Sequence, residues 1–270
     1  MAINKKLIHF SKGENYDIQK NNGNILDSSI CFIQDRKTIA THGTEYKMIG
    51  WSELLPPPDG IYAISSTGLF IDYNLADTTA TGVVLIAGEH KFMIAKSDAT
   101  DGTNTTFYWT KSFSDLSLNN YTKVNGTNNS GHLPKPDGTF SGSTHLSDDF
   151  TTWTAGALSD FNGKANTAII AEASSNVRDM CTILNTFNAS DNFKDWYVPA
   201  CGQLALIYLN MTKINTALEN IGGTPLAADF YWSSSEYSIR YAWYIVFNNG
   251  YVDDFNGKDK TYRVRFIRDI

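Results

Sequence analysis

The order of hydrophobic and polar positions divides the second part of the chain into β-rich ends and a helical middle. Short runs of β-branched and aromatic residues, separated by turn residues, occur at 60–96 and again from Phe230 to Ile270, and they predict paired strands. The run Gly82–Ala87 is apolar without alternation, which predicts a strand buried on both faces. Asn249-Gly250 is the strongest hairpin turn signal in the chain. Charged and bulky side chains alternate from Arg263 to Arg268, which predicts a half-buried strand over 262–267.

The helical middle is predicted from apolar residues that recur at helical spacing. One such stretch covers 165–187, and a second begins after Pro199 and stops at Gly222-Gly223. Between the β and helical parts, 97–163 is poor in aliphatic residues and rich in Gly, Ser, Thr, Asn and Asp, which predicts a long insertion. Its expected anchors are large aromatic residues such as Trp109, Phe113 and Trp153.

The same pattern of strand and turn residues predicts that the first 55 residues form a separate unit. Ser29–Ile33 and Thr38–Thr41 predict a β-hairpin, and the stiff Pro-rich stretch that begins after Leu55 marks a boundary. A hairpin this small is marginal alone, so we expect it to pack on the rest of the chain or on copies of itself. The predicted domains are a β-rich mounting or oligomerisation module at 1–55 and a larger domain at 60–270.

Composition and charge narrow the possible partners. The net charge is −6 and the sequence pI is about 5.3, which argues against nucleic acid because phosphate binding needs a basic face. The first residues lack the apolar run of a signal peptide, and no window reaches the length of a membrane span. We therefore expect synthesis in the cytoplasm without a signal peptide and no membrane partner. The 14 Tyr fit either an adaptable binding surface or a Tyr-rich β core.

No pattern of catalytic or metal-binding residues stands out. The three cysteines, an odd number, form no disulfide framework and are interpreted as buried or free thiols: Cys31, Cys181 and Cys201. No two of the five histidines have the spacing of metal ligands. Phosphate-loop and Gly-x-Ser-x-Gly motifs are missing from the sequence. We expect no cofactor, no metal and no enzymatic activity.

The segment from Asp195 to the end carries a recognisable series of motifs. It contains Trp196-Tyr197-Val198-Pro199-Ala200, then Gly-Gln-Leu, Ile-Gly-Gly, Tyr-Trp-Ser-Ser-Ser-Glu and a terminal Tyr-Arg-Val-Arg. It resembles the C-type-lectin-like variable proteins that retroelements diversify in phages and bacteria, among them the phage tropism determinants. The resemblance covers about 60–270 and is weakest over 97–163. It implies an α+β, C-type-lectin-like fold of two helices and antiparallel strands, with the small β-rich N-terminal module.

The same resemblance assigns roles to individual residues. Trp196, Trp232 and Trp243 would be core anchors, Ser233 to Ser235 would bond buried backbone groups, and Arg263 and Arg265 would make structural hydrogen bonds. In the resembled family, asparagine codons of the template are randomised; the first two bases of AAC can change to encode Tyr, Ser, Ile, Arg, Asp or Phe, but not Trp, Lys or Glu. The residues between the fixed motifs belong to the reachable set and form the predicted variable binding surface: Tyr237, Ser238, Ile239, Arg240, Tyr241, Tyr244, Tyr251, Asp253, Asp254, Phe255 and Asn256.

The resemblance implies a receptor-binding protein of a phage or prophage tail tip. It would bind a cell-surface protein or glycan as a homotrimer, located on the virion or the cell surface. The alternative is a surface or fimbria-like adhesin of the same fold without diversification. An enzyme is the least favoured reading, although formylglycine-generating enzymes of a related fold use two cysteines. Asp253, Asp254 and Asn256 suggest calcium ligands, but the Glu-Pro-Asn, Gln-Pro-Asp and Trp-Asn-Asp signatures of sugar-binding lectins do not occur.

Overall fold

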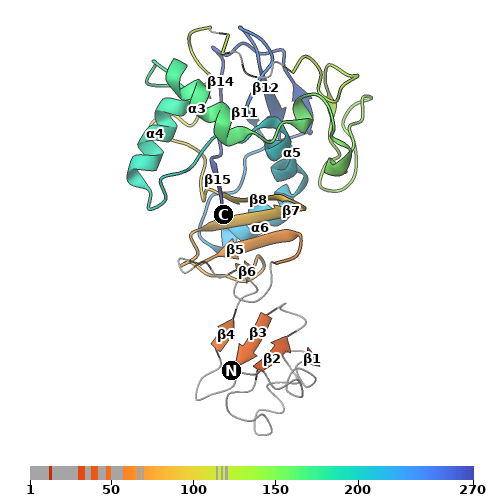
Figure 1. The fold of residues 1–270 in the computed structure, drawn as a ribbon, viewed down its shortest axis with the longest axis vertical. Helices are drawn as coiled ribbons and strands as arrows, with labels where there is room; N and C mark the ends of the chain where they lie inside the picture. Colours follow the sequence, from red (N-terminus) through yellow and green to blue (C-terminus); the bar gives the residue numbers. More distant parts are fainter. Residues whose placement is uncertain are drawn as a thin grey trace.

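The computed structural model describes residues 57–270, apart from 66, 67, 69, 114, 117, 119 and 120, and the backbone of four short strands before them (Figure 1). These strands are β1 (Lys12–Gly13), β2 (Ile30–Ile33), β3 (Thr38–Thr41) and β4 (Lys47–Ile49), and they form one sheet in that order. The antiparallel pairing of β2 with β3 confirms the strands of the predicted hairpin. The predicted mounting role of 1–55 lies outside the described residues.

A five-stranded antiparallel sheet holds both ends of the larger domain. Its order is β15-β8-β7-β5-β6, with β5 at Gly60–Ile64, β6 at Phe70–Asp72, β7 at Gly82–Ala87, β8 at His90–Ile94 and β15 at Ile267–Asp269. Every residue of β7 is buried, as the unbroken apolar run predicts. The last strand, β15, pairs with β8, so residues 95–266 form one long excursion between neighbouring strands.

Four α-helices occur in the described residues, where the sequence pattern predicts two. The first predicted helix is α3 (Gly163–Ala173) followed by α4 (Met180–Ser190), and the second is α5 (Cys201–Leu209) followed by α6 (Met211–Asn220). The first break is stabilised by Asp179, whose carboxylate accepts the backbone N–H groups of Ser175 and Asn176. At the second break the Asn210 side chain bonds back to Leu206 O, and one residue serves both helix ends. The helical spacing of apolar residues continues through both breaks, so the sequence pattern alone does not show that the helices are interrupted.

A second sheet has the order β10-β13-β12-β11, with β10 at Gly131–His132, β11 at Phe230–Glu236, β12 at Ala242–Val246 and β13 at Tyr251–Asp253. Gly250 takes a φ of 75° in the turn between β12 and β13, as predicted for Asn249-Gly250. The predicted strand at 262–267 is wrong, because β14 (Thr261–Tyr262) pairs with β9 (Phe107–Tyr108) and β15 begins only at Ile267. The intervening Arg265 is fully buried against Asp98, so charged and apolar side chains do not alternate there between solvent and core.

The two sheets and the helices enclose two apolar cores. Alternate side chains of β7 enter different cores: Val83 and Leu85 pack with residues of α5 and α6, while Val84 and Ile86 pack with residues of α3 and α4. Figure 1 shows α3 and α4 on one side of the β11 and β12 strands and α5 on the other. The chain is therefore a mixed α+β protein of helices and antiparallel sheets.

Large aromatic residues fix the excursion to these cores. The predicted anchors Trp196, Trp232 and Trp243 are buried. In the insertion, Trp109 and Trp153 are also buried, and the Trp109 indole donates to Ser233 O at 2.8 Å. The prediction is wrong for Phe113, which is 41% exposed.

Candidate ligand-binding surface

Two segments that flank strands β12 and β13 meet at one end of the second sheet. The loop 237–241 is closed by the backbone N–H groups of Tyr237 and Ser238, which both donate to Tyr241 O at 3.1 Å. The segment after β13 lies against this loop, since Tyr241 forms a β-bridge with Gly257 and Lys258 N donates to Arg240 O at 2.9 Å. The fold therefore brings the two ends of the predicted variable region together.

These segments display large side chains to solvent. Phe255 is 77% exposed and stacks on Tyr241 at 6.0 Å between ring centroids, while Ile239 is also exposed. Tyr237 meets the Tyr241 ring edge-on at 6.4 Å. The Arg240 guanidinium lies 5.3 Å from the ring centroid of Phe113, a residue that the sequence analysis did not place at the site. We call the following six residues the aromatic patch: Phe113, Tyr237, Ile239, Arg240, Tyr241 and Phe255.

A buried ion pair lies directly below the aromatic patch. Glu236 is the last residue of β11, and Lys258 lies in the segment after β13. Both side chains are fully buried and form a salt bridge. The Lys258 ammonium also lies 4.5 Å from the ring centroid of Trp109. Burial lowers the pKa of Lys258, and the Glu236 carboxylate opposes that shift. The pair ties the two chain segments to each other at the point where both reach the surface.

Two predicted surface residues are buried and are removed from the candidate site. Tyr244 is 3% exposed; its hydroxyl donates to Asp253 Oδ2 at 2.7 Å and accepts from Asn256 Nδ2 at 2.6 Å. Burial, reinforced by Asp253, raises the pKa of Tyr244. Asp254 is also buried, and burial with the nearby charge of Asp253 raises its pKa to about 6. The burial of Tyr244 and Asp254 could not be predicted from the sequence, because Tyr and Asp are also common at exposed positions.

Tyr251 lies apart from the aromatic patch. It pairs with Val246 in the β12–β13 ladder, at the other end of β12 from Tyr241. Its hydroxyl is 2.9 Å from Ser130 Oγ, and its ring packs on His132 of the insertion at 4.7 Å. The predicted surface thus separates into the patch residues, with Ser238 beside them, and a second half-buried group of Tyr251, Asp253 and Asn256 on the sheet.

The predicted structural roles are confirmed for Ser233, Ser235 and the two arginines, but not for Ser234, whose buried Oγ has no hydrogen-bond partner among the described residues. Ser233 Oγ donates to Trp243 O at 2.8 Å, and Ser235 Oγ donates to Asp160 and accepts from Cys201 N. Arg265 donates to Asp98 Oδ1 at 2.7 Å, and Arg263 donates to Asp229 at 2.9 Å. These contacts hold the framework below the candidate site and leave the two arginines unavailable to a ligand.

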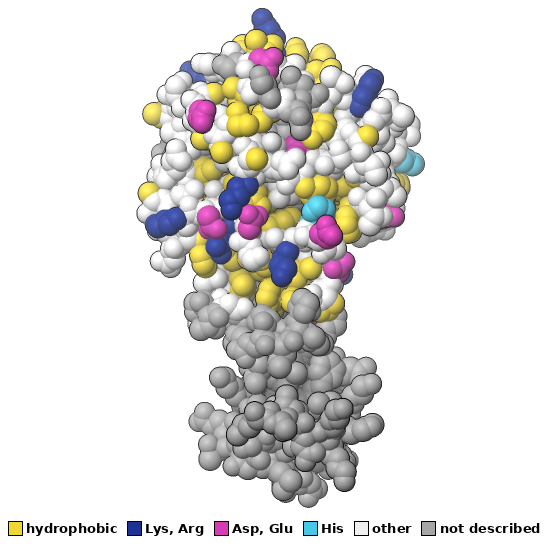
Figure 2. All heavy atoms as spheres, viewed as in Figure 1, with side chains coloured by type: hydrophobic (Ala, Val, Ile, Leu, Met, Phe, Trp, Pro, Cys, Tyr) yellow, Lys and Arg dark blue, Asp and Glu magenta, His cyan; other side chains and the backbone are white. Residues whose placement is uncertain are grey.

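The cysteine and histidine side chains that could suggest catalysis or metal binding do not come together in one site among the described residues. Cys181 and Cys201 are buried, and burial raises the pKa of Cys181 to about 12 and that of Cys201 well above its usual value. His132 and His145 form a β-bridge in the insertion, yet no group of three or more metal-ligating side chains occurs within the described residues. No helix of the described chain is long and apolar enough to cross a membrane. On the face in Figure 2, acidic and basic side chains are scattered, and no continuous basic patch is visible.

Comparison with known proteins gives one informative likeness. No family profile matches the chain, and no curated protein matches it. Among solved structures, the chain is similar to a fimbrial protein from Bacteroides ovatus, with 12% sequence identity and a TM-score of 0.52. The match covers 87% of this chain and 57% of the fimbrial chain, so this chain spans little more than half of that protein. At this identity the likeness concerns the fold alone.

Proposed function

We propose that the chain is a surface adhesin-like binding protein that contacts its partner through the aromatic patch. The observation that carries the proposal is the exposed Phe255, stacked on the half-buried Tyr241 beside exposed Ile239 and Arg240, on loops fixed from below by a buried ion pair. Aromatic and Arg side chains dominate binding energy at protein interfaces, and rigid loops lose little entropy on binding. The fold likeness to a fimbrial protein supports the same class.

The finer part of the proposal concerns the fold and the partner. The long excursion between β8 and β15, together with the motifs after Asp195, supports a C-type-lectin-like domain. The partner is a protein or glycan on a cell surface, and the protein itself acts at a surface without enzymatic activity. Residues 1–55 would mount it, as a trimer or another homo-oligomer, so that several weak contacts add up.

Adhesion of protein-coated beads tests the proposal. Fluorescent beads carrying the full chain are applied to mucin, to cultured epithelial cells and to bacterial cells. We expect adhesion to at least one of these surfaces and at least a tenfold loss with Tyr241→Ala or Phe255→Ala. Val177→Ala is the matched control, because Val177 is exposed to nearly the same fraction as Phe255 and lies outside the patch. Beads that adhere to none of the surfaces, or adhere equally with the patch variants, contradict the proposal.

The pattern of reachable residues favours diversification by a retroelement as a second candidate. Tyr237, Ile239, Arg240, Tyr241 and Phe255 are all encoded by codons that mutation of AAC can reach, and all lie in the aromatic patch. Three neighbouring residues that such mutation cannot produce are fully buried: Glu236, Trp243 and Lys258. Sequencing the 3′ region across related isolates tests this candidate. Substitutions confined to patch positions and matched to template adenines support it, whereas evenly scattered substitutions with no template nearby leave an undiversified adhesin.

A further inference from the structure

Four Asn-Gly pairs lie in the described part of the chain. They occupy positions 125–126, 162–163, 249–250 and 256–257. In such a pair the backbone nitrogen of glycine can attack the side-chain amide of the asparagine before it, because glycine has no side chain to hinder the approach. The attack requires an asparagine side chain that can turn toward that nitrogen and a glycine N–H group that no other group holds. These two conditions distinguish the four pairs.

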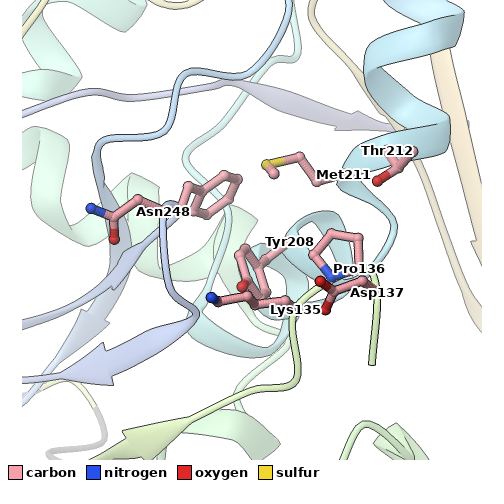
Figure 3. Close-up of a pocket in the computed structure, with 8 residues that line it drawn as sticks. Lys135, Pro136, Asp137, Tyr208, Met211, Thr212 and Asn248 are labelled. Atoms are coloured by element: carbon pink, nitrogen blue, oxygen red, sulfur yellow. The ribbon is translucent and has the colours of Figure 1, made fainter. Parts of the chain in front are cut away.

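The Asn249-Gly250 pair is held on both sides. Gly250 N donates to Val246 O at 2.8 Å, and Asn249 Oδ1 accepts from Tyr251 N at 3.0 Å. Gly250 also packs so closely that a Cβ atom in its place would lie 2.8 Å from Tyr208 Cε1. Tyr208 lines a pocket of about 400 Å³ next to this turn (Figure 3). Both conditions for attack therefore fail at this pair.

Two further pairs each fail one condition. Gly163 is the buried first residue of α3, and a Cβ atom there would lie 2.3 Å from Gln203 Oε1, so its backbone is too tightly packed for the rearrangement. Asn125 Oδ1 accepts from Asn128 N at 3.1 Å. This bond directs the Asn125 side chain into the turn ahead of it and away from the next nitrogen.

The fourth pair, Asn256-Gly257, meets both conditions. Gly257 N forms no hydrogen bond within the described residues, and Gly257 is only half-buried, so water reaches the pair. The Asn256 side chain donates one hydrogen bond, from Nδ2 to Tyr244 Oη at 2.6 Å, and this bond has to break before the side chain turns. The pair follows Phe255 of the aromatic patch directly in the chain.

We propose that Asn256 is a site of spontaneous deamidation and that its product loosens the aromatic patch. Gly257 N, after giving its proton to hydroxide, attacks Asn256 Cγ. The N–Cγ bond forms, the Cγ–Nδ2 bond breaks, and Nδ2 takes a proton from water and leaves as ammonia. The resulting succinimide ring then adds water at one of its two carbonyl carbons and opens to aspartate or isoaspartate. Water is consumed and ammonia is released, so the reaction requires no cofactor or oxidant.

The product disturbs a chain of hydrogen bonds that holds this segment to the sheet. Tyr244 Oη has one hydrogen, which it donates to Asp253 Oδ2 at 2.7 Å, and the Asn256 amide supplies the hydrogen for the second bond. An aspartate at this position has no hydrogen to donate at neutral pH. It also adds a carboxylate where burial and the charge of Asp253 already raise the pKa of Asp254. The new charge is therefore repelled, and the bond to Tyr244 is lost.

The loss reaches the aromatic patch through the residues on either side of Asn256. Phe255 precedes it and stacks on Tyr241, and Tyr241 forms a β-bridge with Gly257. Isoaspartate also adds one methylene group to the backbone between Phe255 and Gly257, which shifts one side of the bridge against the other. Any effect on adhesion rests on the proposed function, whereas the reaction and the loosening do not.

Peptide mapping by mass spectrometry measures the reaction in the full chain after storage at mildly alkaline pH. We expect conversion at Asn256 to be at least tenfold faster than at Asn249. Gly257→Ala is the matched control, because it keeps the Asn256 side chain and hinders the attacking nitrogen. The added Cβ atom meets at short range only the end of the exposed Asp259 side chain. Equal rates at Asn256 and Asn249, or a rate at Asn256 that Gly257→Ala does not lower, overturn the proposal.

Asn256→Asp tests the consequence without storage. Amide hydrogen exchange should become at least tenfold faster at Lys258 N, which donates to Arg240 O at 2.9 Å across the two segments. Unchanged exchange overturns the loosening. Wild-type beads should lose adhesion on storage while Gly257→Ala beads keep theirs, and equal losses contradict an effect on the patch. Fresh wild-type beads that adhere to no surface contradict the proposed function alone, because conversion and exchange are measured without a partner.

Discussion

Replacement of Lys258 by Met tests whether the buried ion pair supports the aromatic patch. In the wild-type chain the Lys258 ammonium contacts the Glu236 carboxylate and the Trp109 ring, and neither charged side chain is exposed. Met has a similar length and no charge, so the substitution keeps the packing and removes the partner of Glu236. The carboxylate is then left buried with weak compensation: Oε1 keeps a 3.4 Å hydrogen bond from Leu116 N, and Oε2 has no partner in the described residues.

The expected loss follows from that geometry. Breaking a buried ion pair by removing one partner costs about 3–5 kcal/mol, because an uncompensated charge remains in the core. A surface pair contributes only about 0–1 kcal/mol. The exposed pair of Lys164 with Asp269, with side chains 60% and 53% exposed, supplies the matched control Lys164→Met. Adding Glu236→Gln to Lys258→Met should recover at least half of the loss, because the amide carries no charge.

Urea unfolding measures the free energies, and amide hydrogen exchange locates the effect. We expect faster exchange at the N–H groups of Tyr237, Ser238 and Lys258, whose acceptors close the patch loops. A loss below about 1 kcal/mol for Lys258→Met, equal to that of Lys164→Met, would refute the reasoning. Unchanged exchange at the three amides would separately show that the pair does not hold the loops.

Two further predictions concern charges elsewhere. Asp98→Ala leaves the fully buried Arg265 without its carboxylate and should cost about 3–5 kcal/mol in urea unfolding, against about 1 kcal/mol or less for Asp195→Ala, whose arginine partner is partly exposed. The pKa of Asp254, raised to about 6 from a usual 3.8, means that the folded state binds the extra proton, so wild-type stability falls as pH rises from about 4 to 6. Asp254→Asn should remove that slope and stabilise the protein by about 1–2 kcal/mol at pH 7 after allowance for solvent screening; unfolding curves with equal pH slopes for the two proteins would contradict this.

The strands and the core could be predicted from sequence because their signals are local. Gly88 and Gly250 lie in the turns of two hairpins, and turn residues of this kind can be recognised in the sequence. The continuous apolar run Gly82–Ala87 likewise predicts a strand that is buried on both faces. The helix breaks could not be predicted, since the bonds that stabilise them involve single polar side chains such as Asp179 and Asn210. The strand predicted over Arg265 failed because its ion-pair partner, Asp98, lies far away in the sequence.

The candidate site was predictable only in part for the same reason. The motifs around it located the segments of Tyr241 and Phe255, but burial of Tyr244 and Asp254 depends on tertiary packing. Phe113 reaches the patch from an insertion that carries no motif, and only the fold places it beside Arg240.

Photo-crosslinking from the aromatic patch tests the central claim most directly. A benzophenone amino acid replaces Phe255 in one preparation and Val177 in another, since these residues are 77% and 76% exposed. Each protein is illuminated on the surface to which wild-type beads adhere. A binding protein that uses the aromatic patch yields a crosslinked partner from position 255 and none from position 177. Equal crosslinking from both positions, or crosslinking from 177 alone, would contradict the assignment of the patch as the adhesive surface.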